Sequence, residues 1–232
     1  MSRRIALSTK TPAPARNIAA RSGRKFVTLG KRARISSAAL RGPYLPPERW
    51  YEPTEQFTGR FSVIVQPAGI GYRHVVTDDD IRRRLSQLPA WMIRPLEVVQ
   101  LSQMTRKKRH APCYGMQWGN AIYLYPIEET LIEVFNDPPK PAQRIEAAMY
   151  GARWARQDAQ WRLLWSEDAI RDFYLNNVLI HELGHILDDR NNSSRDRERF
   201  AEWFALEVGY KGSRREELAQ RTVTKYVVRR HG

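Results

Sequence analysis

Residues 179–187 read LIHELGHIL, and this stretch contains the most specific pattern in the chain. It lies within residues 167–188, which contain no proline and carry apolar residues at helical spacing, so the sequence predicts a helix there. His181 and His185 are four residues apart, so both rings lie on one face of that helix. Two imidazoles placed in this way can bind one metal ion, and Zn²⁺ is the ion that we predict.

Glu182 follows the first histidine and lies beside the open side of the predicted metal site. A metal ion lowers the pKa of a bound water molecule, and a neighbouring carboxylate can accept the proton. We therefore predict Glu182 as a general base rather than a ligand. Gly184 in the middle of the helix costs about 1 kcal/mol relative to alanine, so we expect another element to pack closely against it.

Two glutamates in the next predicted helix, residues 195–208, are candidates for the third ligand. Glu198 and Glu202 are four residues apart and share one face. In an antiparallel helical hairpin, Glu198 comes level with His185 and Glu202 comes level with His181. We predict Glu198 as the ligand and Glu202 as the acid that orients a histidine ring from outside the ligand set. The reverse assignment of the two glutamates stays open.

Other carboxylates near the motif are weaker candidates. Asp188 and Asp189 lie at the C-terminal end of the predicted helix, where the helix dipole disfavours negative charge, so we place them below Glu198 as ligands. Glu202 is flanked by Ala201, Trp203 and Phe204, and we expect it to be shielded from solvent.

The two motifs together, HELGH at residues 181–185 and ERFAE at residues 198–202, resemble those of the gluzincin metallopeptidases. The second motif is similar to that of CAAX-prenyl-protease-like and ImmA-like enzymes. The resemblance implies a zincin-like α+β fold, with a small twisted mixed sheet followed by a helical half that carries the active-site helix. It also implies zinc-dependent hydrolysis of a protein or peptide substrate, and a sheet edge strand that lines the cleft, for which residues 121–125 are our candidate.

The remaining elements are predicted from periodicity and turn signals. Strands are expected mainly in the first half, at residues 61–65, 72–76, 96–101, 121–125 and 130–135, with the first two forming a hairpin and with a long loop at 102–119. Helices are expected at residues 77–88, 141–164, 167–188, 195–208 and 214–229. This order favours an α+β domain with segregated elements.

The net charge of +14 is concentrated in the N-terminal region. Residues 1–47 hold eleven Lys or Arg and no acid, which leaves +3 for residues 48–232. We predict a basic, largely disordered tail at residues 1–55 and a zincin-like domain at residues 56–232. The tail is expected to contact nucleic acid or another polyanion, with organellar targeting or a merely solvated extension as alternatives. The run Arg106–His110 is either a second polyanion contact or a solvated loop, since charge alone does not choose between them.

A second hypothesis for function follows from this charge: a non-catalytic binding or assembly protein, anchored by its basic tail to nucleic acid or a large particle. Cys113 is the only cysteine, so an intramolecular disulfide and a cysteine-based zinc site are excluded, and a cytoplasmic or other reducing compartment is expected. No apolar run approaches the roughly 18 residues that a membrane span requires.

Overall fold

The computed structural model describes residues 60–110 and 112–215 of the chain. The predicted tail at residues 1–55 and nearly all of the predicted helix at 214–229 lie outside these residues, so the predictions made for them are untested. The strands of the described part are β1 (Ser62–Val65), β2 (Tyr72–Arg73), β3 (Val98–Leu101), β4 (Gly115–Trp118), β5 (Ala121–Leu124), β6 (Ile127–Glu128), β7 (Ile132–Phe135), β8 (Arg153–Gln157) and β9 (Gln160–Leu164).

The helices of the described part are α1 (Asp78–Ser86), α2 (Ala90–Ile93), α3 (Arg106–His110), α4 (Pro141–Met149), α5 (Glu167–Phe173), α6 (Leu179–Leu187) and α7 (Ser194–Phe204). Two π-helical segments, η1 (Tyr174–Val178) and η2 (Ala205–Tyr210), extend them. Because η1 joins α5 to α6 without a break, the helix predicted at residues 167–188 is confirmed. The combination of sheets and helices also confirms the α+β class.

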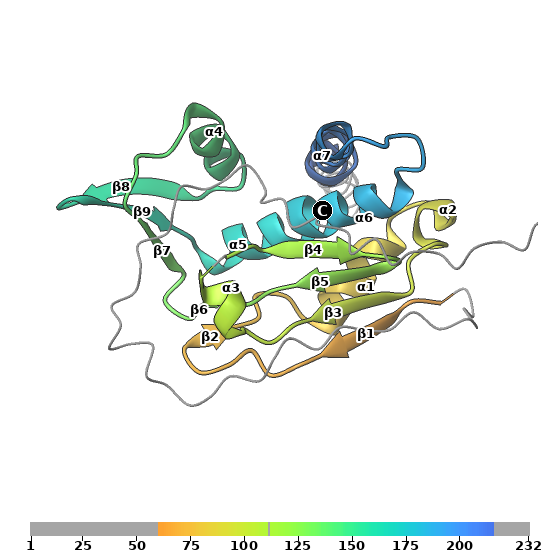
Figure 1. Cartoon of the computed structure of the whole chain (residues 1–232), viewed down its shortest axis with the longest axis horizontal. Helices are drawn as coiled ribbons and strands as arrows, with labels where there is room; N and C mark the ends of the chain where they lie inside the picture. The colour runs from red at the N-terminus through yellow and green to blue at the C-terminus, as the bar shows by residue number, and fades with distance from the viewer. Residues whose placement is uncertain (1–59, 111, 216–232) are drawn as a thin grey trace, which may run out of the picture.

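The central sheet has four strands in the order β1-β3-β5-β4 (Figure 1). The pairs β1–β3 and β3–β5 are parallel and β4–β5 is antiparallel, so the sheet is mixed. A separate antiparallel pair joins β2 to β6, and a three-stranded antiparallel sheet has the order β7-β9-β8. The β8–β9 hairpin lies at the opposite end of the molecule from α2 (Figure 1).

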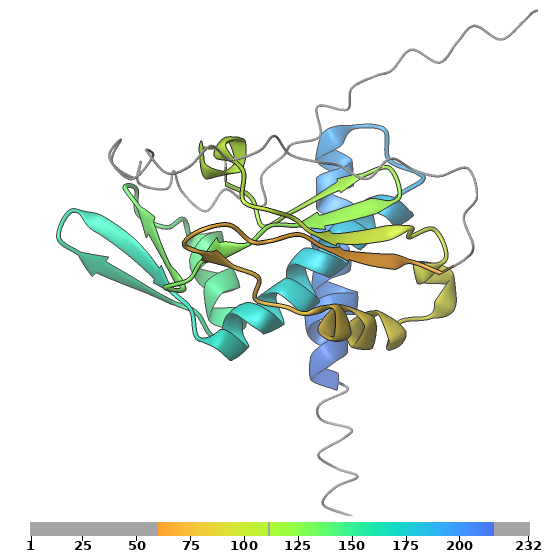
Figure 2. The ribbon, with the colours of Figure 1, turned by 90° about the horizontal axis from the view of Figure 1, so that it is seen from below.

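The main core lies between one face of the central sheet and the helices α1, α5 and α6, which lie together on that side (Figure 2). Strands β3 and β5 are buried along their whole length, as expected for inner strands with apolar residues on both faces. Their inward side chains pack with Ile170, Phe173, Leu179 and Leu183 of the long helix. This packing fixes the helix that carries the histidines against the sheet.

The predicted hairpin of residues 61–65 and 72–76 is wrong. β1 instead pairs in parallel with β3, with Ser62 opposite Val98, and β2 pairs with β6. A parallel pair needs a crossover connection, and the segment with α1 and α2 supplies it. Sequence proximity favoured the hairpin, but the apolar residues of β1 complete the edge of the buried sheet.

The predicted helix at residues 141–164 is also wrong beyond Met149. Gly151 has a φ of +79°, a left-handed conformation that ends α4. Residues 153–164 then form a hairpin that turns at Asp158, whose φ is +55°. Trp154 and Trp161 do pack against the core as expected, but from strands rather than from a helix.

The stretch predicted as a loop, residues 102–119, contains α3 and β4. This changes the predicted edge strand: β5, which covers most of residues 121–125, is an inner strand, and β4 is the edge beside α6. β4 has the sequence GMQW, which is too short and too mixed in polarity for its pattern to indicate a strand.

The described residues include no helix with the length and apolarity of a membrane span.

Candidate metal centre

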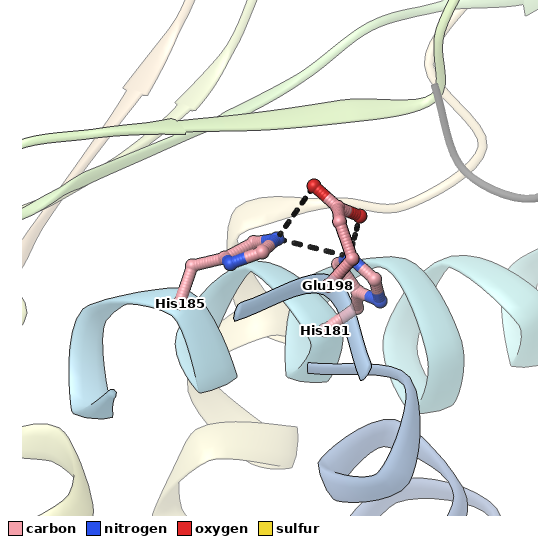
Figure 3. A group of neighbouring side chains, drawn as sticks. All are labelled: His181, His185 and Glu198. Carbon is pink, nitrogen blue, oxygen red and sulfur yellow. Dashed lines mark hydrogen bonds and ion pairs between the residues drawn. The ribbon is translucent and has the colours of Figure 1, made fainter. Parts of the chain in front are cut away.

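Three predicted ligands, His181, His185 and Glu198, come together in the structure (Figure 3). The Nε2 atoms of His181 and His185 are 3.1 Å apart. Glu198 Oε2 lies 3.7 Å from the first of these nitrogens and Oε1 lies 3.7 Å from the second. One ligand atom from each residue fits within 4.8 Å of the others. The sequence-based choice of Glu198 thus agrees with this arrangement.

The spacing and the chemistry of these atoms fit a zinc ion. Tetrahedral zinc with bonds of about 2.0–2.1 Å places neighbouring ligand atoms about 3.3 Å apart. The observed separations of 3.1 and 3.7 Å bracket that value. Two imidazoles with one carboxylate are also a ligand set of catalytic zinc sites, in which the fourth position stays open.

The protonation state of His185 suits coordination. Burial, followed by the neighbouring His181, lowers the pKa of His185 to about 4, although the charges of Glu198 and Asp188 act in the opposite direction. The ring is therefore neutral at pH 7, which is the form that binds a metal. The 3.7 Å contact with Glu198 is then not an ion pair at neutral pH. His181 and His185 are only 2% and 7% exposed, so their rings are shielded from bulk water.

Close packing of α7 on α6 brings Glu198 to the histidines. A Cβ atom added to Gly184 would lie 3.1 Å from the Ala201 Cα and 3.2 Å from the Phe204 Cβ. This confirms the packing partner expected for Gly184. Arg197 adds a hydrogen bond, with its Nη2 donating to the His185 carbonyl oxygen at 3.0 Å. Ser193 caps α7, and its Oγ accepts from the Asp196 N–H at 3.1 Å.

The prediction that Glu202 is shielded from solvent is wrong. It is exposed rather than shielded, and it does not belong to the group of three ligand residues. Burial raises the pKa of Glu146 on α4, and the charge of Glu202 adds to that shift. α6 and α7 cross steeply instead of running antiparallel. Figure 1 shows α7 end-on while α6 lies across the view, and Figure 2, turned by 90°, shows α7 along its length. Helices that cross steeply meet at one point, so Glu198 reaches the histidines and Glu202 one turn later does not.

The two aspartates that follow the motif are not part of the ligand group either. Asp188 is buried in the turn between α6 and α7, where its Oδ1 accepts from the Asn191 backbone N–H at 3.2 Å and from Asn191 Nδ2 at 2.9 Å. Asp189 is exposed. Their lower rank as ligands agrees with this arrangement.

Glu182 is buried beside β4. A Cβ atom on Gly115 would lie 2.9 Å from its Oε1. Burial and then the charge of Glu198 raise the pKa of Glu182 to about 8, while Lys108 and the Gln117 N–H act in the opposite direction. A cation held by the neighbouring ligands would favour the ionised form, which is the form that a general base needs.

Only part of the basic run Arg106–His110 faces solvent. Arg106 and Lys107 are exposed, but Lys108 is buried, with its Nζ 3.2 Å from Cys113 Sγ and 4.0 Å from the centre of the Tyr125 ring. Arg109 is half-buried. The prediction that the whole run is available to a polyanion is therefore wrong for Lys108, which instead lies close enough to Glu182 to affect its charge.

Sequence reasoning missed Gly115, Gln117 and Lys108 as neighbours of the site. All three lie in or before a four-residue edge strand that carries no apolar alternation, so no periodic signal identified them. Comparisons of this chain with protein-family models, with curated proteins and with solved structures gave no match.

Proposed function

We propose that this chain is a zinc-dependent metallopeptidase that hydrolyses peptide bonds, with His181, His185 and Glu198 as the metal ligands and Glu182 as the general base. The observation that carries this proposal is the convergence of the three ligand atoms within 4.8 Å, with both imidazoles buried and that of His185 neutral. Glu182, next in sequence to the first ligand, supplies the general base that hydrolysis also needs.

A zincin-like fold is part of the same proposal. Its support is a mixed sheet whose antiparallel edge strand, β4, lies beside the helix that carries both histidines. An extended peptide can add to such an edge through main-chain hydrogen bonds. The peptide backbone would then pass beside Glu182, which contacts the same strand.

Zinc, when bound, supplies a positive charge that acidifies a water molecule and polarises the substrate carbonyl. Glu182 accepts the proton of the attacking water and later donates it to the departing nitrogen. The buried position of Glu182 excludes bulk water from this transfer and strengthens its interactions with nearby charges. Lys108 adds a positive charge near the carboxylate and favours its ionised form.

The proposal is tested by zinc content and peptidase activity of the purified protein on a general substrate such as denatured casein. Glu182→Gln should retain zinc and lose about 10²–10⁴-fold in activity, as expected for a general base. Glu129→Gln, which changes an exposed glutamate outside the site, is the matched control. A Glu182→Gln protein as active as the control would refute the assignment of the base.

The choice between the two glutamates has its own test. Glu198→Ala should abolish stoichiometric zinc, because it removes one of three ligands, whereas Glu202→Ala should keep it, because that side chain is exposed. The opposite result would exchange the roles of the two residues.

A second candidate function is supported by the charge of residues 1–47, with eleven Lys or Arg and no acid. Such a segment can anchor the protein to nucleic acid or a large particle, with or without catalysis. It predicts binding to a polyanion that weakens steeply with salt.

A further inference from the structure

The excess positive charge of the described domain is concentrated in one segment. Residues 140–164, which include α4, β8 and β9, hold five Lys or Arg and two acids. The other described residues hold 18 Lys or Arg and 18 Asp or Glu. The body of the domain is therefore electrically balanced, and its excess charge of +3 belongs to this segment. The β8–β9 hairpin of the segment extends from the body in both views (Figures 1 and 2).

Four arginines carry most of this charge. They are Arg144 on α4, Arg153 and Arg156 on β8, and Arg162 on β9. Within residues 60–110 and 112–215, no carboxylate forms an ion pair with any of these four side chains, whereas Arg82 on α1 pairs with Asp78 at 2.6 Å. The charge of the hairpin is therefore not neutralised by acids of the described domain.

Arg162 has a donor that lacks an acceptor. The residue is half-buried, and its Nε is shielded from water without a hydrogen-bond acceptor in the described part of the chain. A shielded charged donor is costly unless it is bonded, so this position favours an anionic ligand.

The four arginines lie on both faces of the hairpin. β8 is the outer strand of its sheet, and side chains three residues apart on a strand point to opposite faces, so Arg153 and Arg156 do so. Arg156 is opposite Trp161, and the guanidinium of Arg144 lies over that ring at 5.3 Å from its centre. Arg162 shares the face of Arg153. Each face of this outer edge thus has two arginines.

This arrangement fits the phosphates of duplex DNA better than a lipid surface. Guanidinium groups bind phosphate through two parallel hydrogen bonds. The major groove, about 12 Å wide, admits a β-ribbon and has phosphates along both walls, whereas a flat lipid surface meets only one face. The hairpin tip, QDAQ at residues 157–160, has no large apolar side chain to enter a lipid layer. Its Asp158 occupies the left-handed position of the turn, for which Asp is suited.

We propose that the β8–β9 hairpin binds duplex DNA, with Arg153 and Arg162 on the phosphates of one groove wall and Arg144 and Arg156 on those of the other. This inference rests on the second candidate function, the anchoring to nucleic acid, and not on the peptidase function. Four phosphate contacts are fewer than the roughly 6–10 of a typical DNA-binding protein, so the hairpin adds to the attraction of the basic tail and does not replace it. The hairpin orients the folded domain on the duplex.

The proposal is tested by fluorescence anisotropy of a labelled DNA duplex, titrated with the full-length chain at about 50–200 mM salt. Arg153→Gln combined with Arg156→Gln should lower the salt slope by about 2 and weaken binding by about 10-fold, because two charged phosphate contacts are lost. The matched control is Arg94→Gln combined with Arg195→Gln, which also removes two exposed arginines. Equal slopes and affinities of the two double variants would overturn the proposal.

A charge-preserving variant separates electrostatics from folding. Arg153→Lys combined with Arg156→Lys keeps both charges but not the bidentate geometry, so the salt slope should be retained and affinity should fall by only about 3-fold. A slope as low as that of the glutamine variant would contradict the role assigned to the two charges.

Two other polyanions test the choice of partner. Vesicles of phosphatidylserine with phosphatidylcholine, and poly-glutamate, should bind the hairpin glutamine variant and its control equally. A difference between the two variants on either probe as large as that on DNA would overturn the assignment to DNA. If wild type shows no salt-sensitive binding to the duplex, the second candidate function fails together with this inference, whereas equal binding by the hairpin variant and its control overturns this inference alone.

Discussion

Gly184→Ala should have two opposite effects on stability, a gain from helix propensity and a loss from overpacking where α6 and α7 cross. Alanine in place of a mid-helix glycine gains about 1 kcal/mol of unfolding free energy. The new Cβ, however, would lie 3.1 Å from the Ala201 Cα and 3.2 Å from the Phe204 Cβ, so α7 has to move by a few tenths of an ångström. Overpacking of this kind costs about 1–3 kcal/mol. We expect a net loss of about 1 kcal/mol in the free energy of unfolding.

The same displacement should weaken zinc binding, because Glu198 is carried on the helix that moves. Ligand distances have to lie within about 0.2 Å of their ideal values, so a shift of this size should lower zinc affinity by about 10-fold or more. Urea unfolding measures the first effect, and competition with a chromophoric chelator measures the second.

Gly212→Ala is the matched control for this change. Gly212 is also helical, but the nearest atom to its added Cβ is the Glu207 carbonyl oxygen at 3.8 Å, which is ordinary contact. It should therefore gain about 1 kcal/mol without any change in zinc affinity. The packing argument is refuted if Gly184→Ala stabilises the protein as Gly212→Ala does and keeps its zinc affinity.

Three further predictions concern the site, its surroundings and the tail. His181→Ala should lose stoichiometric zinc, and elemental analysis showing undiminished zinc would remove this residue from the ligand set. Burial raises the pKa of Glu146 from 4.5 to about 7, so the folded protein disfavours its charged form. The free energy of unfolding should therefore be highest below pH 4.5 and fall by about 3 kcal/mol as the pH rises to 7. Glu146→Gln should remove this loss, and urea unfolding at pH 5 and pH 8 should show a flatter profile for the variant than for wild type; parallel profiles would contradict the shift. Deletion of residues 1–47 should abolish salt-sensitive binding to nucleic acid, and a salt slope equal to that of the full chain would exclude the tail as the contact.

The candidate metal centre was predictable from sequence to the extent that the relation of its residues is local. His181, Glu182 and His185 lie within five residues of one helix, so helical geometry alone sets their relation. The choice of Glu198 rested on an antiparallel hairpin that the structure does not have. Glu198 still lies beside the histidines because the short connection at residues 188–193 keeps the start of α7 close to the end of α6. The position of Glu202 was not, because it depends on the angle at which the helices cross, and that angle follows from the packing at Gly184 rather than from any spacing in the sequence.

The sheet was harder to predict because its pairing is non-local. β1 pairs with a strand more than thirty residues later, and nothing in its own sequence distinguishes that partner from the nearer β2. The 141–164 region was misassigned for a different reason. Trp154 and Trp161 stand seven residues apart, a helical spacing, but the left-handed Gly151 and Asp158 impose a strand and a turn there.

Buried Arg84 on α1 links the two helices of the candidate metal centre, at a distance from the proposed ligands. Its Nε donates to Asn176 Oδ1 at 2.5 Å and its Nη2 donates to the Val208 carbonyl at 3.0 Å. Asn176 lies in η1, directly before the helix of the histidines, and Val208 lies in η2, directly after the helix of Glu198. A π-helical turn takes up one residue more than an α-helical turn, so each segment sets which face the adjoining helix presents. Arg84 bonds to both segments, and Gly209 of η2 packs directly on the Asn176 carbonyl of η1, so these contacts together hold in place the two helices whose side chains have to meet at the proposed site.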